Sequence, residues 1–212
     1  TGFKVNSGEY KLMGLAPYGK PKYKDLIMKK LMDLKEDGSF KLNMKYFNYA
    51  TGLTMTNKKF SDLFGYPVRD SKKDLLNDFH MDIASSIQAV TEEVVIRLTR
   101  NIADEYKIKN LCLAGGVALN CVANGKILQE KIFDNIWIQP AAGDAGGSLG
   151  AALALWYIDQ GNNRLVNPND DMKGSYLGTE FNQDDIEKEL KLMGANFEIL
   201  KYEELIDKTA EL

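Results

Sequence analysis

Histidine and cysteine are scarce in this chain of 212 residues, which contains one histidine, His80, and two cysteines, Cys112 and Cys121. With no second histidine to join it, His80 is a poor candidate for metal ligation or for a catalytic triad. The two cysteines lack CxxC spacing, which argues against a zinc site and a disulfide. We therefore expect two reduced cysteines in the core of a cytosolic protein.

Basic blocks and long apolar runs are also missing. The formal net charge is −3, which argues against a nucleic-acid-binding protein but leaves room for a small anionic ligand. The longest apolar stretch, residues 145–158, carries three glycines and is too short to span a bilayer. No signal peptide is recognisable. These absences predict a cytoplasmic protein without nucleic-acid or membrane partners.

Residues 111–152 contain two consecutive strand–turn–helix patterns, around which the rest of the chain is organised. In the first, residues 111–113 are predicted to form a buried strand, Gly115 and Gly116 the turn, and residues 117–130 a helix. Such a turn presents backbone N–H groups to an anion or a nucleotide. The alternative is a tight connection without a ligand, because an isolated glycine motif is a weak signal.

The second pattern predicts a strand over residues 136–138, a loop over 140–144 and a helix over 146–159. Asp144 stands before the helix among glycines and alanines, which would let the loop approach a phosphate while the carboxylate holds a bridging metal. The alternatives are an N-cap role for Asp144 and close packing of the helix through its glycines. Together the two patterns predict an α/β fold.

The rest of the chain is predicted mainly from apolar periodicity. Residues 71–106 place an apolar residue every three or four positions, which predicts the longest helix, capped by Ser71 with Asp74 or by Asp78, with His80 off the apolar stripe. The other predicted elements are a loop over 8–21, a helix over 22–35, a strand over 39–42, a short helix near 60–64, a linker over 160–172, a helix over 182–193 and a strand near 196–200.

Three motifs in this order carry a family resemblance: GEYKLMGLAPYG from Gly8, NLCLAGGVALNCVANGKI from Asn110 and IQPAAGDAGGSLGAALA from Ile138. They closely resemble the carbamoyltransferase family that includes nodulation-factor, tobramycin and cephamycin O-carbamoyltransferases. The resemblance implies an RNase H-like lobe of the actin/Hsp70/sugar-kinase type over residues 1–160. It also implies a linker over 161–172 and, over 173–212, the start of an α+β domain similar to the carbamoyl-adenylate synthases.

The resemblance further implies a two-step reaction, in which carbamoyl phosphate and ATP give carbamoyl-adenylate, whose carbamoyl group then moves to a hydroxyl of a small acceptor. It implies that Asp144 is a catalytic metal ligand beside two histidines from another part of the fold, with Fe, Mn or Mg as the divalent metal. The residues implied in binding the adenylate are Gly115, Gly116, Val117, Asn120 and Gly143, with Glu9 and Lys11 near the ribose and phosphates.

In the family, the two histidines would precede Thr1 and the arginine-rich carbamoyl phosphate site would follow Leu212, so we expect a fragment that is inactive alone. Two other functions stay open from the sequence. One is an ATP-hydrolysing or kinase-type enzyme of the same superfamily, and the other is a non-catalytic nucleotide-binding module that keeps the glycine turns for packing.

Overall fold

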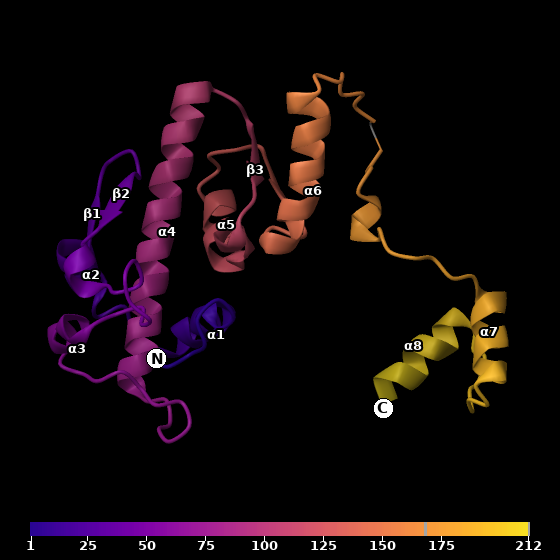
Figure 1. Cartoon of the computed structure of the whole chain (residues 1–212), viewed down its shortest axis with the longest axis horizontal. Coiled ribbons are helices and arrows are strands. Elements are labelled where there is room, and N and C mark those ends of the chain that lie inside the picture. The colour runs from indigo at the N-terminus through magenta and orange to yellow at the C-terminus, as the bar shows by residue number, and fades with distance from the viewer. Residues whose placement is uncertain (168, 212) are drawn as a thin grey trace. The chain divides into compact units, whose positions relative to one another are not determined.

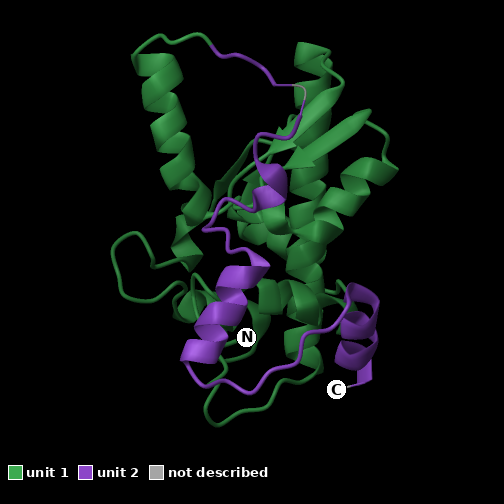
Figure 2. Cartoon of the chain, turned by 90° about the vertical axis from the view of Figure 1, so that its right-hand side faces the viewer, with its two compact units in different colours: residues 1–163 green, residues 164–212 purple. Residues whose placement is uncertain are grey.

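The computed structural model describes residues 1–167 and 169–211. The chain divides into two compact units, Thr1–Asn163 and Arg164–Leu212, which are coloured separately in Figure 2. Helices predominate, and the strands form one antiparallel and one parallel pair. The chain is thus a mixed α/β structure, as predicted.

Helix α4 (Asp78–Tyr106) is the central element of the first unit. Helices α1 (Glu9–Leu15), α2 (Lys24–Lys30) and α5 (Cys121–Gln129) all pack against it (Figure 1). Because neighbours cover it on several sides, residues outside the expected apolar stripe are also buried. These buried polar residues are His80, Asp82, Ser86, Glu92 and Thr99.

The N-terminus of α4 is capped by Asn77 and not by any of the predicted residues. The Asn77 side chain accepts the His80 N–H at 3.4 Å, and the Asn77 N–H donates to His80 Nδ1 at 3.1 Å. This reciprocal capping box satisfies two backbone donors. The helix also occupies less of the predicted range 71–106 than expected, because residues 71–77 form a turn and an irregular segment.

The N-terminal region is more regular than the sequence suggested. The predicted loop over residues 8–21 contains α1 and a 3-10 helix (Ala16–Tyr18), in whose first turn Pro17 lies, where its missing N–H costs no hydrogen bond. The predicted helix over 22–35 was wrong in its second half. Helix α2 ends at Lys30, and β1 (Met32–Leu34) pairs antiparallel with β2 (Phe40–Leu42), which confirms the strand predicted over residues 39–42.

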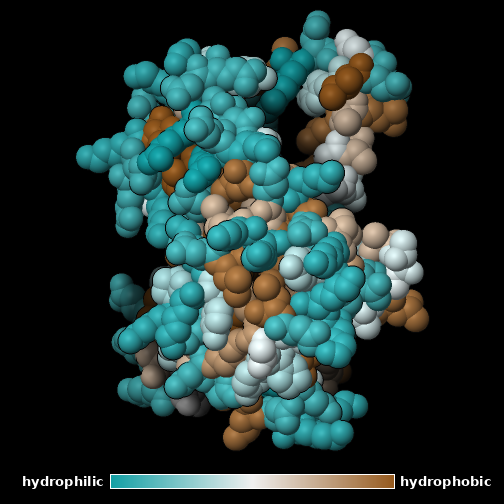
Figure 3. Space-filling model, turned by 90° about the vertical axis from the view of Figure 1, so that its left-hand side faces the viewer, coloured by the Kyte–Doolittle hydropathy of each residue, from teal (hydrophilic) through white to brown (hydrophobic). Residues whose placement is uncertain are grey.

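Helix α3 (Lys58–Phe64) confirms the predicted short helix in the aromatic-rich segment and follows a 3-10 turn (Met44–Tyr46). Ile27, Leu31, Val90 and Val94 form the core beneath α2, the β1–β2 hairpin and α3. Figure 3 shows this side of the molecule as mostly hydrophilic, with apolar residues gathered in patches between hydrophilic ones.

Strands β3 (Asn110–Leu113) and β4 (Asn135–Ile138) form the parallel pair, with Leu111 opposite Ile136 and Leu113 opposite Ile138. Leu111, Ile127 and Phe133 form a second core against α4. The opposite side of the pair is open, because Trp137 is 49% exposed and Cys112 is exposed. Both cysteines are free, as predicted, but they lie at the surface and not in the core.

The second glycine turn leads into α6 (Asp144–Ala154), which continues through a π-helical turn (Leu155–Asp159). The helix therefore starts two residues earlier than predicted, at Asp144 itself. It has no buried residue, and Leu153 and Trp156 are about half exposed.

In the second unit, a 3-10 turn (Lys173–Ser175) precedes α7 (Gln183–Leu192) and α8 (Tyr202–Glu211). Asn182 caps α7 by accepting the Asp185 N–H at 2.9 Å, which confirms the helix predicted there. The strand predicted near residues 196–200 is absent, since these described residues pair with no other segment. Among the described residues, no helix combines the length and the apolar character needed to cross a membrane.

Candidate functional site

The two glycine turns meet at the carboxyl ends of the parallel strands. The Gln139 N–H donates to the Leu113 carbonyl at 3.0 Å, and the Gly115 N–H donates to the Ala142 carbonyl at 2.7 Å. Hydrogen bonding thus continues beyond the last paired residues of β3 and β4 and joins one turn directly to the other. Ligands of open α/β sheets bind at this edge of the strands.

The first turn needs glycine at position 115 for its backbone conformation. Gly115 has φ of +98°, in the region that favours glycine, and a Cβ added there would meet no atom within 4 Å. Space is equally open at Gly116, and Val117 is 63% exposed. The backbone of this turn is therefore accessible on its outer side.

The segment after the first turn is not the single helix predicted over residues 117–130. A 3-10 helix (Gly116–Leu119) comes first, and α5 starts at Cys121 with Asn120 as its N-cap. The Asn120 side chain accepts the Ala123 N–H at 3.1 Å. Asn120 therefore lies at the junction of two helices instead of one turn inside a single helix.

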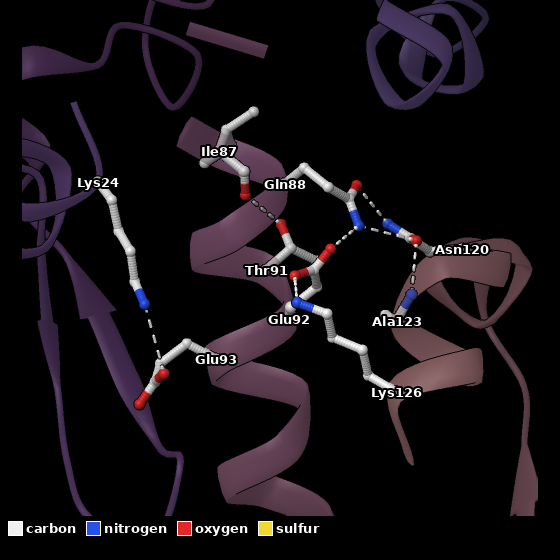
Figure 4. A network of polar contacts seen from close by, with 9 residues as sticks. All are labelled: Lys24, Ile87, Gln88, Thr91, Glu92, Glu93, Asn120, Ala123 and Lys126. Carbon is white, nitrogen blue, oxygen red and sulfur yellow. Dashed lines mark hydrogen bonds and ion pairs between the residues drawn. The ribbon is translucent and has the colours of Figure 1, made fainter. Parts of the chain in front are cut away.

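Asn120 also joins a polar network between α4 and α5, which Figure 4 shows. Its side-chain amide exchanges two hydrogen bonds with that of Gln88, at 3.1 and 3.0 Å. The Gln88 amide also donates to one oxygen of Glu92 at 2.9 Å, and Lys126 forms an ion pair with the other oxygen. The residue proposed from the sequence as a ligand contact thus spends most of its hydrogen bonds inside the protein.

Asp144 is the first residue of α6, with Gly143 as the N-cap. The structure therefore contradicts the N-cap alternative for Asp144. Its carboxylate is exposed and makes no hydrogen bond or ion pair with any of the described residues. No side chain of the described residues caps this helix, so the N–H groups of its first turn lack a side-chain partner there. A negative charge is favoured at this positive end of the helix dipole.

Asp144 would be a lone protein ligand for a metal within this chain. The part of the chain that the structure describes contains no group of three or more His, Cys, Asp or Glu side chains placed to hold one metal ion. His80 lies in the capping box of α4, 2% exposed. A free carboxylate beside a helix N-terminus fits a hard divalent cation that takes its other ligands from phosphate, water or other residues.

Glu9 and Lys11 lie on α1, and neither makes a side-chain hydrogen bond or ion pair with the glycine turns among the described residues. The Glu9 carboxylate accepts the N–H groups of Asn6 and Gly8, at 2.9 and 3.1 Å. The pKa of Glu9 is lowered by hydrogen bonds from backbone N–H groups. The N–H of Glu9 itself has the largest effect, followed by that of Asn6. The visible role of Glu9 is thus to order the turn before α1.

Two surface hollows are lined by residues outside the glycine turns. One is on α7, and the other lies between α4 and the β1–β2 turn. The second is lined by Glu36, Asp37, Glu93, Arg97, Arg100, Asn101 and Asp104. Neither hollow includes a residue of the candidate site.

Sequence reasoning did not find the residues that support the site from α4 and α5. Glu92 and Glu93 are adjacent carboxylates in one helix, yet Glu92 is 7% exposed and joins the network to Asn120, whereas Glu93 pairs with Arg97 at 2.8 Å. No pattern in the sequence distinguishes them. Lys126 equally resembles an ordinary surface lysine.

Comparison with known proteins supplies the remaining finding. The sequence profile described as Carbamoyltransferase N-terminus matches residues 1–153. An uncharacterized protein of Synechocystis, sll1178, is 61% identical over all of this chain, which covers 35% of that protein. Nodulation protein NolNO of Sinorhizobium fredii is 33% identical over 96% of this chain and 28% of the relative. Nodulation protein NolO of Bradyrhizobium diazoefficiens is 36% identical over 69% of this chain and 25% of the relative. The chain thus spans about a quarter to a third of these relatives.

Proposed function

This chain belongs to the carbamoyltransferase N-terminus family, and from that premise we propose that it forms part of a site that transfers a carbamoyl group to a hydroxyl. The donor would be a carbamoyl-adenylate made from carbamoyl phosphate and ATP. The acceptor would be a small hydroxyl-bearing molecule, in a protein of the cytoplasm, where both precursors are available. The acceptor oxygen forms a bond to the carbamoyl carbon, AMP leaves, and the hydroxyl proton passes to a base.

The hydrogen bond between Gly115 and Ala142 is the observation that carries this proposal, because it joins two turns that lack bulky side chains. The turns bring an accessible glycine backbone next to the N-terminus of α6, whose first-turn N–H groups have no side-chain cap in the part of the chain that the structure describes. Such N–H groups bind phosphate oxygens. We propose that Gly115, Gly116, Val117 and Gly143 lie against the adenylate.

Asp144 would hold the divalent metal, with its other ligands supplied from outside this chain. Such a metal would neutralise charge on the phosphate and polarise the carbamoyl oxygen. Without a cation, the carboxylate and a phosphate would compete for the same positive helix end. Glu9 and Lys11 stay proposed neighbours of the ribose and phosphates. The RNase H-like lobe, the linker and the start of a synthase-like second domain also belong to this proposal.

Asp144→Asn in the protein that contains this chain tests the proposal, with Asp78→Asn as its control. Both are exposed carboxylates at the first position of an α-helix, so both variants lose the same favourable interaction with a helix dipole. We expect AMP release that depends on ATP, carbamoyl phosphate and acceptor in the wild type. Asp144→Asn should lower its rate by about 100-fold or more, and Asp78→Asn should not. Equal rates in the two variants would refute a role for Asp144.

A non-catalytic nucleotide-binding module is the second candidate, favoured by the internal hydrogen bonds of Asn120. It predicts ATP binding without any turnover of carbamoyl phosphate. A kinase-type or ATP-hydrolysing enzyme would instead release ADP. Identification of the nucleotide product therefore separates all three functions in one assay.

A further inference from the structure

The carboxylate of Glu92 is buried between α4 and α5, at a position where an apolar side chain would avoid the free energy of desolvating a charge. Glu92 is 7% exposed, and on the same helix Val90 and Val94 belong to one apolar core while Val95 and Ile96 border another. Burial of a carboxylate costs desolvation, which here is offset by hydrogen bonds and by an ion pair to Lys126, whose side chain is 50% exposed. A charge at this position therefore points to a role in fixing the direction of its hydrogen-bonding partners.

The partners of Glu92 fix the direction of the Gln88 amide. Both carboxylate oxygens can only accept, so the group that faces Glu92 Oε1 at 2.9 Å is Gln88 Nε2, while Lys126 holds the other oxygen. Gln88 Oε1 must then point away from Glu92, toward Asn120 Nδ2 at 3.0 Å. The carboxylate thus decides which end of the Gln88 amide meets Asn120.

The direction of the Asn120 amide follows from Gln88 and from the backbone. Asn120 Oδ1 accepts from Gln88 Nε2 at 3.1 Å and from the Ala123 N–H at 3.1 Å, which occupies both of its lone pairs. Nδ2 donates one hydrogen to Gln88 Oε1, and its second hydrogen has no partner among the described residues. Asn120 can therefore offer a ligand a donor but no further acceptor.

We propose that Glu92, Gln88 and Lys126 are positioning residues that hold Asn120 as a hydrogen-bond donor beside the first glycine turn. The inference rests on the proposed function, in which this turn binds the adenylate. It adds the polarity of the contact: the nucleotide must present an acceptor to Asn120, such as a ring nitrogen or a ribose or phosphate oxygen. Figure 4 shows the sequence of contacts from Lys126 through Glu92 and Gln88 to Asn120.

The first test compares Glu92→Gln with Glu93→Gln in the protein that contains this chain. The amide introduced at position 92 can donate as well as accept, so Gln88 is no longer held in one orientation, and Asn120 keeps only the Ala123 N–H to fix its own. We expect the KM for ATP to rise about 3- to 10-fold, the worth of one ordinary hydrogen bond, with kcat within about twofold. Glu93, which pairs with Arg97 and Lys24, is the matched control and should leave the KM unchanged.

The second test uses Asn120→Asp, which removes the Nδ2 donor and keeps an oxygen that accepts the Ala123 N–H. Asp caps a helix N-terminus about as well as Asn, so hydrogen-exchange protection of the first turn of α5 should stay close to that of the wild type. The KM for ATP should rise about 10- to 100-fold, because the donor is gone.

The outcomes separate the two proposals. If wild-type protein neither binds ATP in a calorimetric titration nor releases AMP, the proposed function fails and this inference fails with it. If the wild type is active but Glu92→Gln has the same KM as Glu93→Gln, only the positioning role is overturned. A KM for ATP in Asn120→Asp equal to that of the wild type would likewise show that the Nδ2 donor is not used.

Discussion

Gly146 and Gly147 are adjacent glycines in the first turn of α6, and the structure predicts opposite effects when each is replaced by alanine. A Cβ at Gly146 would lie 2.0 Å from the Ala141 carbonyl oxygen, and real Cβ atoms essentially never approach another atom closer than 3.0 Å. The helix start must therefore move away from the Ala141 carbonyl by about 1 Å. A Cβ at Gly147 would meet no atom within 4 Å.

The magnitudes follow from these two environments. Overpacking at Gly146 should cost about 1–3 kcal/mol, partly offset by the better helix propensity of alanine, about 1 kcal/mol. Gly147→Ala should stabilise the helix by up to about 1 kcal/mol for the same reason. The two variants should therefore differ by about 1–3 kcal/mol, or roughly 5- to 150-fold in the local opening equilibrium.

Hydrogen exchange of peptides covering residues 141–150 measures this difference directly, because it reports local opening and not only global unfolding. We expect faster exchange in Gly146→Ala and slower exchange in Gly147→Ala than in the wild type. The AMP-release rate should also fall in Gly146→Ala, because the displaced turn carries the Ala142 carbonyl that binds the Gly115 N–H. Equal protection in the two variants would refute the close approach of Gly146 to Ala141.

Two further predictions concern stability. Ile127 is fully buried in the core beneath β3, so Ile127→Ala should lower the free energy of unfolding by about 2–5 kcal/mol; the control Ile108→Ala, at a residue 59% exposed, should change it by less than about 0.5 kcal/mol in the same denaturant titration. Burial lowers the pKa of His80 below its ordinary value of 6.5. The unfolded chain therefore takes up this proton at a higher pH than the folded one, and stability should fall as the pH drops below about 6.5. His80→Gln keeps an acceptor for the Asn77 N–H but does not titrate, so its Tm should fall less between about pH 7.5 and about pH 5.5; an identical fall would rule out His80 as the source.

The sequence by itself determined the elements whose local signals are strong. The apolar repeat in residues 71–106 predicted the long helix, and a helix predicted over 182–193 matches α7. Glycines between short apolar runs predicted both strand–turn–helix units. Parallel strands adjacent in sequence bring their carboxyl ends together, which is why the two turns of the candidate site could be expected to meet.

Tertiary structure alone decided which side chains those elements bury and what they contact. Glu92 and Glu93 have the same chemistry and the same helix, but only Glu92 faces α5, because burial depends on the neighbour packed against each face. Cys112 lies in a strand yet is exposed, since within Thr1–Asn163 the core covers the other face of the β3–β4 pair. The network that orients Asn120 joins residues 32 positions apart. Such contacts have no local signature, because the free energy that forms them comes from packing between segments distant in the sequence.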